Sequence, residues 1–288
     1  MRFGRHMPLN AKPVRAAEIA RQLGCNSIQI FASNPTGWRP PEGDPKASIA
    51  FAEAARTLDL NPVVIHAPYL INLASPDEII WEKSIALLTW TLQRGTLLNA
   101  QYVIFHTGSH KGTGIEAGIE RIVQAIERIL PVTPPEVMLL LENDVGAGNS
   151  LGSGFEQLAT ILARLPQFAD RLGVCLDTAH LWGAGYDIST AEGVQQVLQQ
   201  FAATVGLANL KVLHLNDTKV ALGSHRDVHA RLGDGIIGAE GFRALLTDPR
   251  LDHIAVIMET PIQTGEDGKE DWEHDKQHFE RMLALLLA

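Results

Sequence analysis

The sequence contains little cysteine: two residues in 288, Cys25 and Cys175. Two thiols cannot form the disulfide framework of a small secreted domain, so we expect both to stay reduced, as in cytosolic proteins. Apolar runs are also short, and none approaches the roughly 20 residues that span a bilayer. Residues 1–15 lack the apolar segment of a secretory signal. The sequence therefore predicts a cytoplasmic protein with no membrane partner.

Basic residues are also few in comparison with acidic residues. Lys and Arg number 24 against 33 Asp and Glu, which gives a formal charge of −9. Proteins that bind nucleic acids usually carry a basic face, so this balance argues against such a partner. This argument against a nucleic-acid partner does not hold if the protein binds cations, because they would offset the negative charge. The 11 histidines raise that question, since imidazole is the commonest metal ligand.

Short apolar segments recur along the whole chain. There are eight, at 1–6, 27–33, 62–68, 101–108, 136–143, 172–180, 210–217 and 253–260. Their nearly continuous apolar character is typical of strands covered on both faces, as in parallel sheets. The sequence therefore predicts eight buried, parallel strands.

The stretches between these strands are typical of helices. Serine capping signals occur in Ser75-Pro76-Asp77-Glu78 and in Ser153-Gly154-Phe155-Glu156. No Pro-, Gly- or Ser-rich linker divides the chain. We therefore expect one (β/α)₈ TIM barrel domain over residues 1–288, with the active site at the C-terminal ends of the strands. A doubly wound open sheet is the alternative.

A glycine-rich segment, DVGAGNSLGSG at 144–154, follows a strand and precedes a helix. It lacks the G-x-G-x-x-G spacing and a later acidic residue for a ribose. We expect a loop that lines the substrate site, and no nucleotide cofactor.

Histidines and acids gather at the predicted strand ends and in the loop after the seventh strand. They are His66, His106, Glu142, Asp177, His180, His214, Asp227, His229 and Glu259. Singly, such a histidine is usually hydrogen-bonded structure, and such an aspartate is often a helix cap. Together, nine polar groups beside a core would be costly, and four close carboxylates would repel one another.

Divalent cations would remove both costs, because imidazole nitrogens and carboxylate oxygens are the donors of zinc-type sites. The sequence therefore predicts a site with several metal ions. The remaining histidines show no such convergence. They are His6, His110, His225, His253, His274 and His278.

Longer motifs surround these residues. They are HAPYLINLASP at 66–76, HTGSH at 106–110, LDTAHLWGAGYD at 176–187, HLNDTK at 214–219 and DVHARLGDGIIG at 227–238. With the nine residues, and in this order, they make the chain resemble the endonuclease IV family (AP endonuclease family 2) over nearly its whole length. The resemblance implies a barrel with three zinc ions that cleaves duplex DNA 5′ to abasic sites, leaving a 3′-hydroxyl and a 5′-deoxyribose phosphate.

The resemblance also assigns ligands. His66 and His106 would bind the first zinc, and Glu142 would bridge it to the second. Asp177, His214 and Glu259 would complete the second, and His180, Asp227 and His229 would bind the third. Glu142 and Glu259 would be the catalytic carboxylates. Mn²⁺ can replace zinc at carboxylate-rich positions. Three dications would offset much of the negative charge, so DNA binding is compatible with the composition.

For DNA contacts the resemblance implies Asn34, Trp38, Tyr69 and Leu70. Tyr69 and Leu70 would wedge into the DNA, as in enzymes that extract a nucleotide from the stack. Apart from the resemblance, local basic groups could meet flanking phosphates, and these are Lys12, Arg39, Lys111, Lys219 and Arg226. A monomer is the default expectation.

The chain departs from the family pattern at two places. Thr36-Gly37 stands where well-known members carry Arg-Gln, and GRHMP at 4–8 replaces a GAHVS-like segment. The first change predicts weaker or more permissive binding of abasic sites.

Two other functions fit parts of the pattern. A sugar isomerase or epimerase of the xylose-isomerase-like barrels would use Glu142, Asp177, His214 and Glu259 around one or two metals, but it has no need for the other five ligands. A non-catalytic protein that binds damaged DNA would not need all nine. The surplus of ligands favours the nuclease.

Overall fold

The computed structural model describes residues 1–8, 12–40, 45–260, 263–265 and 270–287. Eight parallel strands close into a barrel in sequence order, with β8 paired to β1. The strands are β1 Arg2–His6, β2 Ser27–Phe31, β3 Val63–His66, β4 Tyr102–His106, β5 Met138–Glu142, β6 Leu172–Asp177, β7 Leu210–His214 and β8 Ala255–Met258. The (β/α)₈ barrel is confirmed, and the open sheet is wrong.

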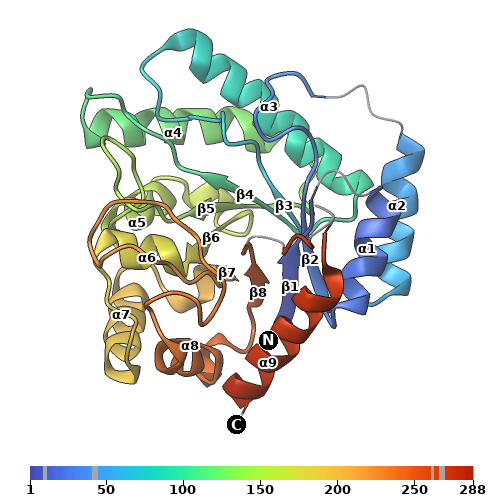
Figure 1. The fold of residues 1–288 in the computed structure, drawn as a ribbon. Helices are drawn as coiled ribbons and strands as arrows, with labels where there is room; N and C mark the ends of the chain where they lie inside the picture. Colours follow the sequence, from blue (N-terminus) through green and yellow to red (C-terminus); the bar gives the residue numbers. More distant parts are fainter. Residues whose placement is uncertain (9–11, 41–44, 261–262, 266–269, 288) are drawn as a thin grey trace.

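Helices surround the barrel (Figure 1). They are α1 Pro13–Gln22, α2 Pro45–Thr57, α3 Glu78–Leu97, α4 Ile115–Ile129, α5 Phe155–Ala163, α6 Thr178–Ala184, α7 Ala191–Thr204, α8 Ala239–Leu246 and α9 Trp272–Leu287. Short 3₁₀ helices follow several of them, η1 Leu130–Val132, η2 Pro166–Phe168, η3 Leu207–Asn209 and η4 Pro249–Leu251. Within the described part of the chain, no helix has the length and apolarity to cross a membrane.

Two helix starts differ from expectation. The N-cap of α3 is Asp77, whose carboxylate accepts from the amides of Ile79 and Ile80 at 2.8 and 3.1 Å. Ser75 instead accepts from the amide of Asp77. Helix α5 begins after Gly154 with no side-chain cap. The serine-cap prediction was wrong at both places, because Asp77 takes the capping role at α3 and Gly154 stands between Ser153 and the start of α5.

The barrel interior is a separate apolar layer from the shell between strands and helices. It consists of Val64, Ile104, Leu140, Cys175, Val212, Ala255 and Ile257. Side chains on a strand alternate between its two faces. The residue two positions after an interior residue therefore also points inward, at the next level. Those residues are His66, His106, Glu142, Asp177, His214 and Glu259, so the strand pattern itself places six acids and histidines above the interior layer.

Candidate metal centre

The predicted ligands lie at one end of the barrel. Five of them are the last residues of their strands: His66, His106, Glu142, Asp177 and His214. Glu259 directly follows β8, His180 lies in α6, and the loop after β7 carries Asp227 and His229. A pocket of about 430 Å³ opens over them, lined by seven of the nine and by Tyr69.

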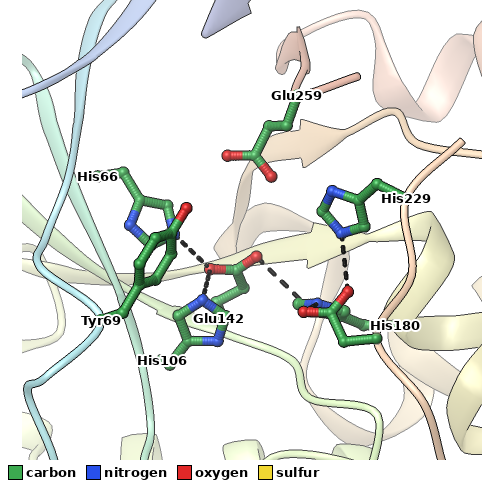
Figure 2. Close-up of a pocket in the computed structure, with 8 residues that line it drawn as sticks. His66, Tyr69, His106, Glu142, His180, His229 and Glu259 are labelled. Atoms are coloured by element: carbon green, nitrogen blue, oxygen red, sulfur yellow. Dashed lines mark hydrogen bonds and ion pairs between the residues drawn. The ribbon is translucent and has the colours of Figure 1, made fainter. Parts of the chain in front are cut away.

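Glu142 occupies the centre of the site and is fully buried (Figure 2). One carboxylate oxygen lies 3.2 Å from His66 Nε2 and 3.6 Å from His106 Nε2. The other lies 3.0 Å from His214 Nδ1 and 3.7 Å from His180 Nδ1. The two oxygens of this carboxylate therefore face two different groups of imidazoles.

The second group forms around His214. Its Nδ1 lies 3.2 Å from Glu259 Oε2 and 3.9 Å from Asp177 Oδ2. One donor atom from each of Glu142, Asp177, His214 and Glu259 lies within 4.8 Å of the others. Asp177 also caps α6, since its Oδ1 accepts from the amide of His180 at 2.9 Å. The cap uses one oxygen and leaves Oδ2 facing the site.

The third group lies on the other side of Glu142 (Figure 2). His180 Nε2 is 3.3 Å from one oxygen of Asp227, and His229 Nε2 is 3.1 Å from the other. His229 Nε2 is also 3.6 Å from Asp177 Oδ2. The side chain of Asp227 is 48% exposed, so this group lies at the mouth of the pocket.

The loop after β7 is held through its backbone amides. The buried carboxylate of Asp217 accepts from the amides of Gly233, Gly235 and Ile237 at 3.0–3.1 Å. The amide of His225 donates to the carbonyl of Gly183 in α6 at 3.0 Å. The loop that carries Asp227 and His229 is therefore tied both to the end of β7 and to the helix that carries His180.

Three imidazoles use one nitrogen for a partner outside the cluster of carboxylates. His66 Nδ1 donates to the carbonyl of Ala67 at 2.7 Å, and His180 Nδ1 donates to that of Asn143 at 2.8 Å. His214 Nε2 lies 2.8 Å from Gln29 Oε1. When these rings are neutral, the hydrogen is on that nitrogen and the other nitrogen faces the site with a free lone pair. Ligating histidines in metalloproteins are oriented in this way.

The carboxylates of the site raise the pKa of several imidazoles and so favour their positively charged form. Burial favours the neutral form of Glu142, but His106 and His214 outweigh burial and hold its pKa well below the usual value. Burial alone would lower the pKa of His180, yet the charge of Asp177 and the hydrogen bond to Asp227 raise it well above. Divalent ions would supply the same positive charge, and the nitrogen and oxygen donors suit zinc-type ions.

His6, which was predicted to lie apart from the convergence, belongs to the site. It is the last residue of β1, and its Nδ1 lies 3.6 Å from Glu259 Oε1 and 2.7 Å from Gln29 Nε2. The prediction was wrong although the signal was the same strand-end position that identified His66 and His106. Gln29 was also missed, and its signal is an amide in the middle of the apolar strand SIQIF.

Two asparagines were missed as well. Asn143 Oδ1 accepts from the amide of Asp177 at 2.6 Å. Asn216 Nδ2 donates to Asp177 Oδ2 at 2.5 Å, and its Oδ1 accepts from the amide of Glu259 at 3.0 Å. Asn143 directly follows the predicted ligand Glu142, and Asn216 lies two positions after the predicted ligand His214. Asn143 therefore holds the backbone of Asp177, and Asn216 orients the carboxylate of Asp177 and holds the backbone of Glu259.

The residues predicted to contact DNA lie in loops at the same end. Tyr69 is 55% exposed, with its ring centroid 5.3 Å from that of His66. Its amide donates to the carbonyl of Pro35 at 2.9 Å, which joins the loop with Tyr69 and Leu70 to the loop with Asn34 and Trp38. Leu70 and Trp38 are half-buried, whereas Asn34 and Lys219 are exposed.

In the segment at 4–8, which differs from the family pattern, Arg5 makes several contacts. This side chain is 4% exposed and donates to Thr260 Oγ1 and to the Thr260 carbonyl, both at 3.1 Å. It also lies 3.4 Å from Asp275 Oδ2 in α9. Arg5 therefore connects β1 to the residue after Glu259 and to the last helix.

Known proteins resemble this chain throughout. The sequence model of the xylose-isomerase-like TIM barrels matches residues 17–282. A probable endonuclease 4 from Natranaerobius thermophilus is 46% identical over 261 residues, 91% of this chain and 92% of that protein. One from Halothermothrix orenii is 40% identical over 267 residues, 93% and 96% of the two chains.

Solved structures agree. Endonuclease IV from Thermus thermophilus matches with a TM-score of 0.81 at 38% identity, over 99% of both chains. D-psicose 3-epimerase from Clostridium cellulolyticum matches with a TM-score of 0.72 over 100% of this chain and 98% of its own, but at 17% identity, which shows the shared fold alone. The chain therefore belongs to the endonuclease IV family, within the xylose-isomerase-like TIM barrels.

Proposed function

We propose that this protein is an AP endonuclease that hydrolyses the phosphodiester 5′ to abasic sites in duplex DNA, leaving a 3′-hydroxyl and a 5′-deoxyribose phosphate. We expect it to act as a single-domain monomer in the cytoplasm. The observation that carries the proposal is the arrangement of nine nitrogen and oxygen donors in three groups around the buried carboxylate of Glu142. The names of the relatives and of the Thermus structure support the same activity.

The three groups would hold three zinc ions, with Mn²⁺ as a possible substitute. His66, His106 and Glu142 form the first set of donors, and Glu142, Asp177, His214 and Glu259 form the second. For the third we assign His180, Asp227 and His229, because both imidazoles lie within 3.3 Å of the carboxylate of Asp227. When bound, these ions would supply positive charge that offsets the negative charge developing on the phosphodiester.

The residues that line the pocket favour water as the nucleophile. Among its described lining residues there is no Ser, Thr, Cys or Lys. Glu142 and Glu259 are the proposed catalytic carboxylates. Contacts with His66 and His214 would hold the side chain of Glu142 in place, and the contact with Gln29 would hold that of Glu259. The exposed ring of Tyr69 lies over the imidazoles of His66 and His106, where a nucleotide taken out of the stack would pass.

Contacts with DNA would come from the two joined loops and from Lys219. Asn34 Oδ1 accepts from the amide and the hydroxyl of Thr36, both at 3.0 Å, so this short turn is closed by its own residues. Thr36 and Gly37 offer no long side chain to the minor groove. We therefore expect weaker or more permissive binding of abasic duplexes than in members with Arg-Gln. Tighter, strictly abasic-specific binding at matched salt concentration would contradict this.

The decisive experiment uses a duplex with one synthetic abasic site and zinc-loaded protein. We expect a single nick 5′ to the site, with a 3′-end that a DNA polymerase extends, and no nick in the intact duplex. Absence of a nick at stoichiometric enzyme would refute the proposal. Binding without a nick would favour a damaged-DNA-binding protein. If the protein instead converts ketoses, the epimerase function is favoured. In that case five of the nine donors would have no role.

A further inference from the structure

We propose that Gln29 is a positioning residue that fixes both Glu259 and His214 with a single amide, and that His6 in turn fixes that amide. The inference rests on the proposed metal site but adds two residues to it. Gln29 is fully buried in the middle of β2. A buried amide is costly unless its donors and acceptor are satisfied. Its surroundings therefore show what it does.

Three polar atoms surround the amide. Gln29 Nε2 donates to Glu259 Oε1 at 2.5 Å and lies 2.7 Å from His6 Nδ1, and Gln29 Oε1 lies 2.8 Å from His214 Nε2. The two hydrogens of the amide nitrogen and one lone pair of its oxygen are thus in use. Gln29 and His6 are directly paired in the register of β1 and β2. The amide therefore reaches from β2 past β1 to ligands at the ends of β7 and β8.

The orientation of the amide follows from chemistry. An ionised carboxylate only accepts hydrogen bonds, so the amide group that faces Glu259 must be the NH₂. The carbonyl oxygen then faces His214, and His214 Nε2 must carry a hydrogen to donate to it. In the neutral ring, His214 Nδ1 is therefore left without a hydrogen, at 3.0 Å from Glu142 and 3.2 Å from Glu259. One amide sets the tautomer of the imidazole and the direction of the carboxylate.

His6 completes the arrangement. The second amide hydrogen of Gln29 needs an acceptor, and His6 Nδ1 is at the right distance. The ring of His6 packs on Phe31 with centroids 4.4 Å apart, which holds it in place. A rotated amide would place its oxygen against Glu259 Oε1 and its NH₂ against a donor nitrogen of His214. The ionised carboxylate of Glu259 excludes that state, and His6 Nδ1 is then the acceptor for the second amide hydrogen.

Replacing Gln29 should therefore loosen one metal group and spare the others. In Gln29→Leu the volume is similar, but Glu259 and His214 lose their common partner. Groups that orient metal ligands typically change metal affinity by about 10- to 100-fold. We expect a loss of that size for one of three zinc ions, measured by competition with a chelator and by metal analysis of the purified holoenzyme. His6→Phe keeps the ring on Phe31 but not the acceptor, so a smaller loss is expected.

A matched control is available at the other end of the barrel. Gln101 accepts from the amide of Val63 at 2.8 Å and donates to the carbonyl of Asn99 at 2.9 Å. Gln101→Leu removes two hydrogen bonds far from the ligands, so it should lower thermal stability without changing zinc affinity. If Gln29→Leu behaves in the same way, Gln29 is only structural and the inference is wrong.

The outcome separates this inference from the proposed function. Wild-type protein that binds three zinc ions and nicks abasic DNA, together with unchanged zinc affinity in Gln29→Leu and His6→Phe, overturns the inference alone. Wild-type protein that binds three zinc ions without nicking, together with selective loss of one ion in Gln29→Leu, supports the inference and refutes the nuclease. Wild-type protein that binds no zinc refutes both.

Discussion

Asp275 should be one of the most sensitive positions in the protein outside the candidate metal centre. It lies in α9, is 5% exposed, and stands between two guanidinium groups. Its oxygens are 3.4 Å from Arg5 and 3.6 Å from Arg231. Burial lowers the pKa of Arg5, and the charge of Asp275 opposes that effect. The change Asp275→Asn would leave this buried guanidinium beside a neutral amide.

The expected cost follows from burial. Removing one partner of a buried ion pair typically costs about 3–5 kcal/mol. We expect the lower end, about 3 kcal/mol, because the asparagine oxygen can still accept a hydrogen bond and Arg5 keeps its two bonds to Thr260. For a chain of 288 residues that corresponds to a melting temperature lower by roughly 5 °C.

The assay is thermal and urea unfolding of the zinc-loaded protein. Glu273→Gln, an exposed position in the first turn of α9, is the matched control and should change little. A double variant, Arg5→Met with Asp275→Leu, should recover part of the stability, because it removes the charges of Arg5 and Asp275 together and leaves only Arg231 without this partner. A loss below about 1 kcal/mol for Asp275→Asn would mean that this pair behaves like one at the surface. That result would refute the reasoning.

The remaining predictions concern the site and the thiols. Glu142→Gln should slow nicking of abasic DNA by at least about 100-fold. Glu53→Gln, at an exposed position on α2, is the control and should nick at the wild-type rate. An unchanged rate in Glu142→Gln would exclude the bridging role of Glu142. Burial lowers the pKa of His229, but Asp177 and Asp227 raise it to about 9. Zinc binding below about pH 9 should therefore release a proton from His229, and zinc affinity should fall as the pH is lowered. Equal calorimetric heats of zinc binding in buffers of different ionisation enthalpy would contradict this. Burial raises the pKa of Cys25 and Cys175 to about 12. Both thiols should therefore resist a thiol reagent at pH 8 until the protein unfolds. Because the unfolded chain releases these protons first, stability should fall as pH rises from about 9 to about 12; a rising stability in that window would contradict the burial of both thiols.

Local pattern was enough to predict the barrel and where its polar end lies. Strand side chains alternate with a period of two, so an interior residue such as Val64 predicts the direction of His66. The same rule applies to Leu140 and Glu142. Closing eight such strands brings their last residues together, because parallel strands end on the same rim. The convergence of the nine donors could be predicted from the sequence for that reason.

Other features depended on contacts between segments distant in the sequence. Gln29 meets Glu259 across 230 positions, and Arg5 meets Asp275 across 270. An amide in a strand and an arginine in another carry no local sign of such partners. His6 differs, because it ends its strand as His66 and His106 do, and it was wrongly set apart despite that signal. The sequence by itself determined the fold, the donor types and the rim on which they stand. Only the tertiary structure decided which side chains orient the donors, because hydrogen-bond partners are selected by the closure of the barrel and not by position along a strand.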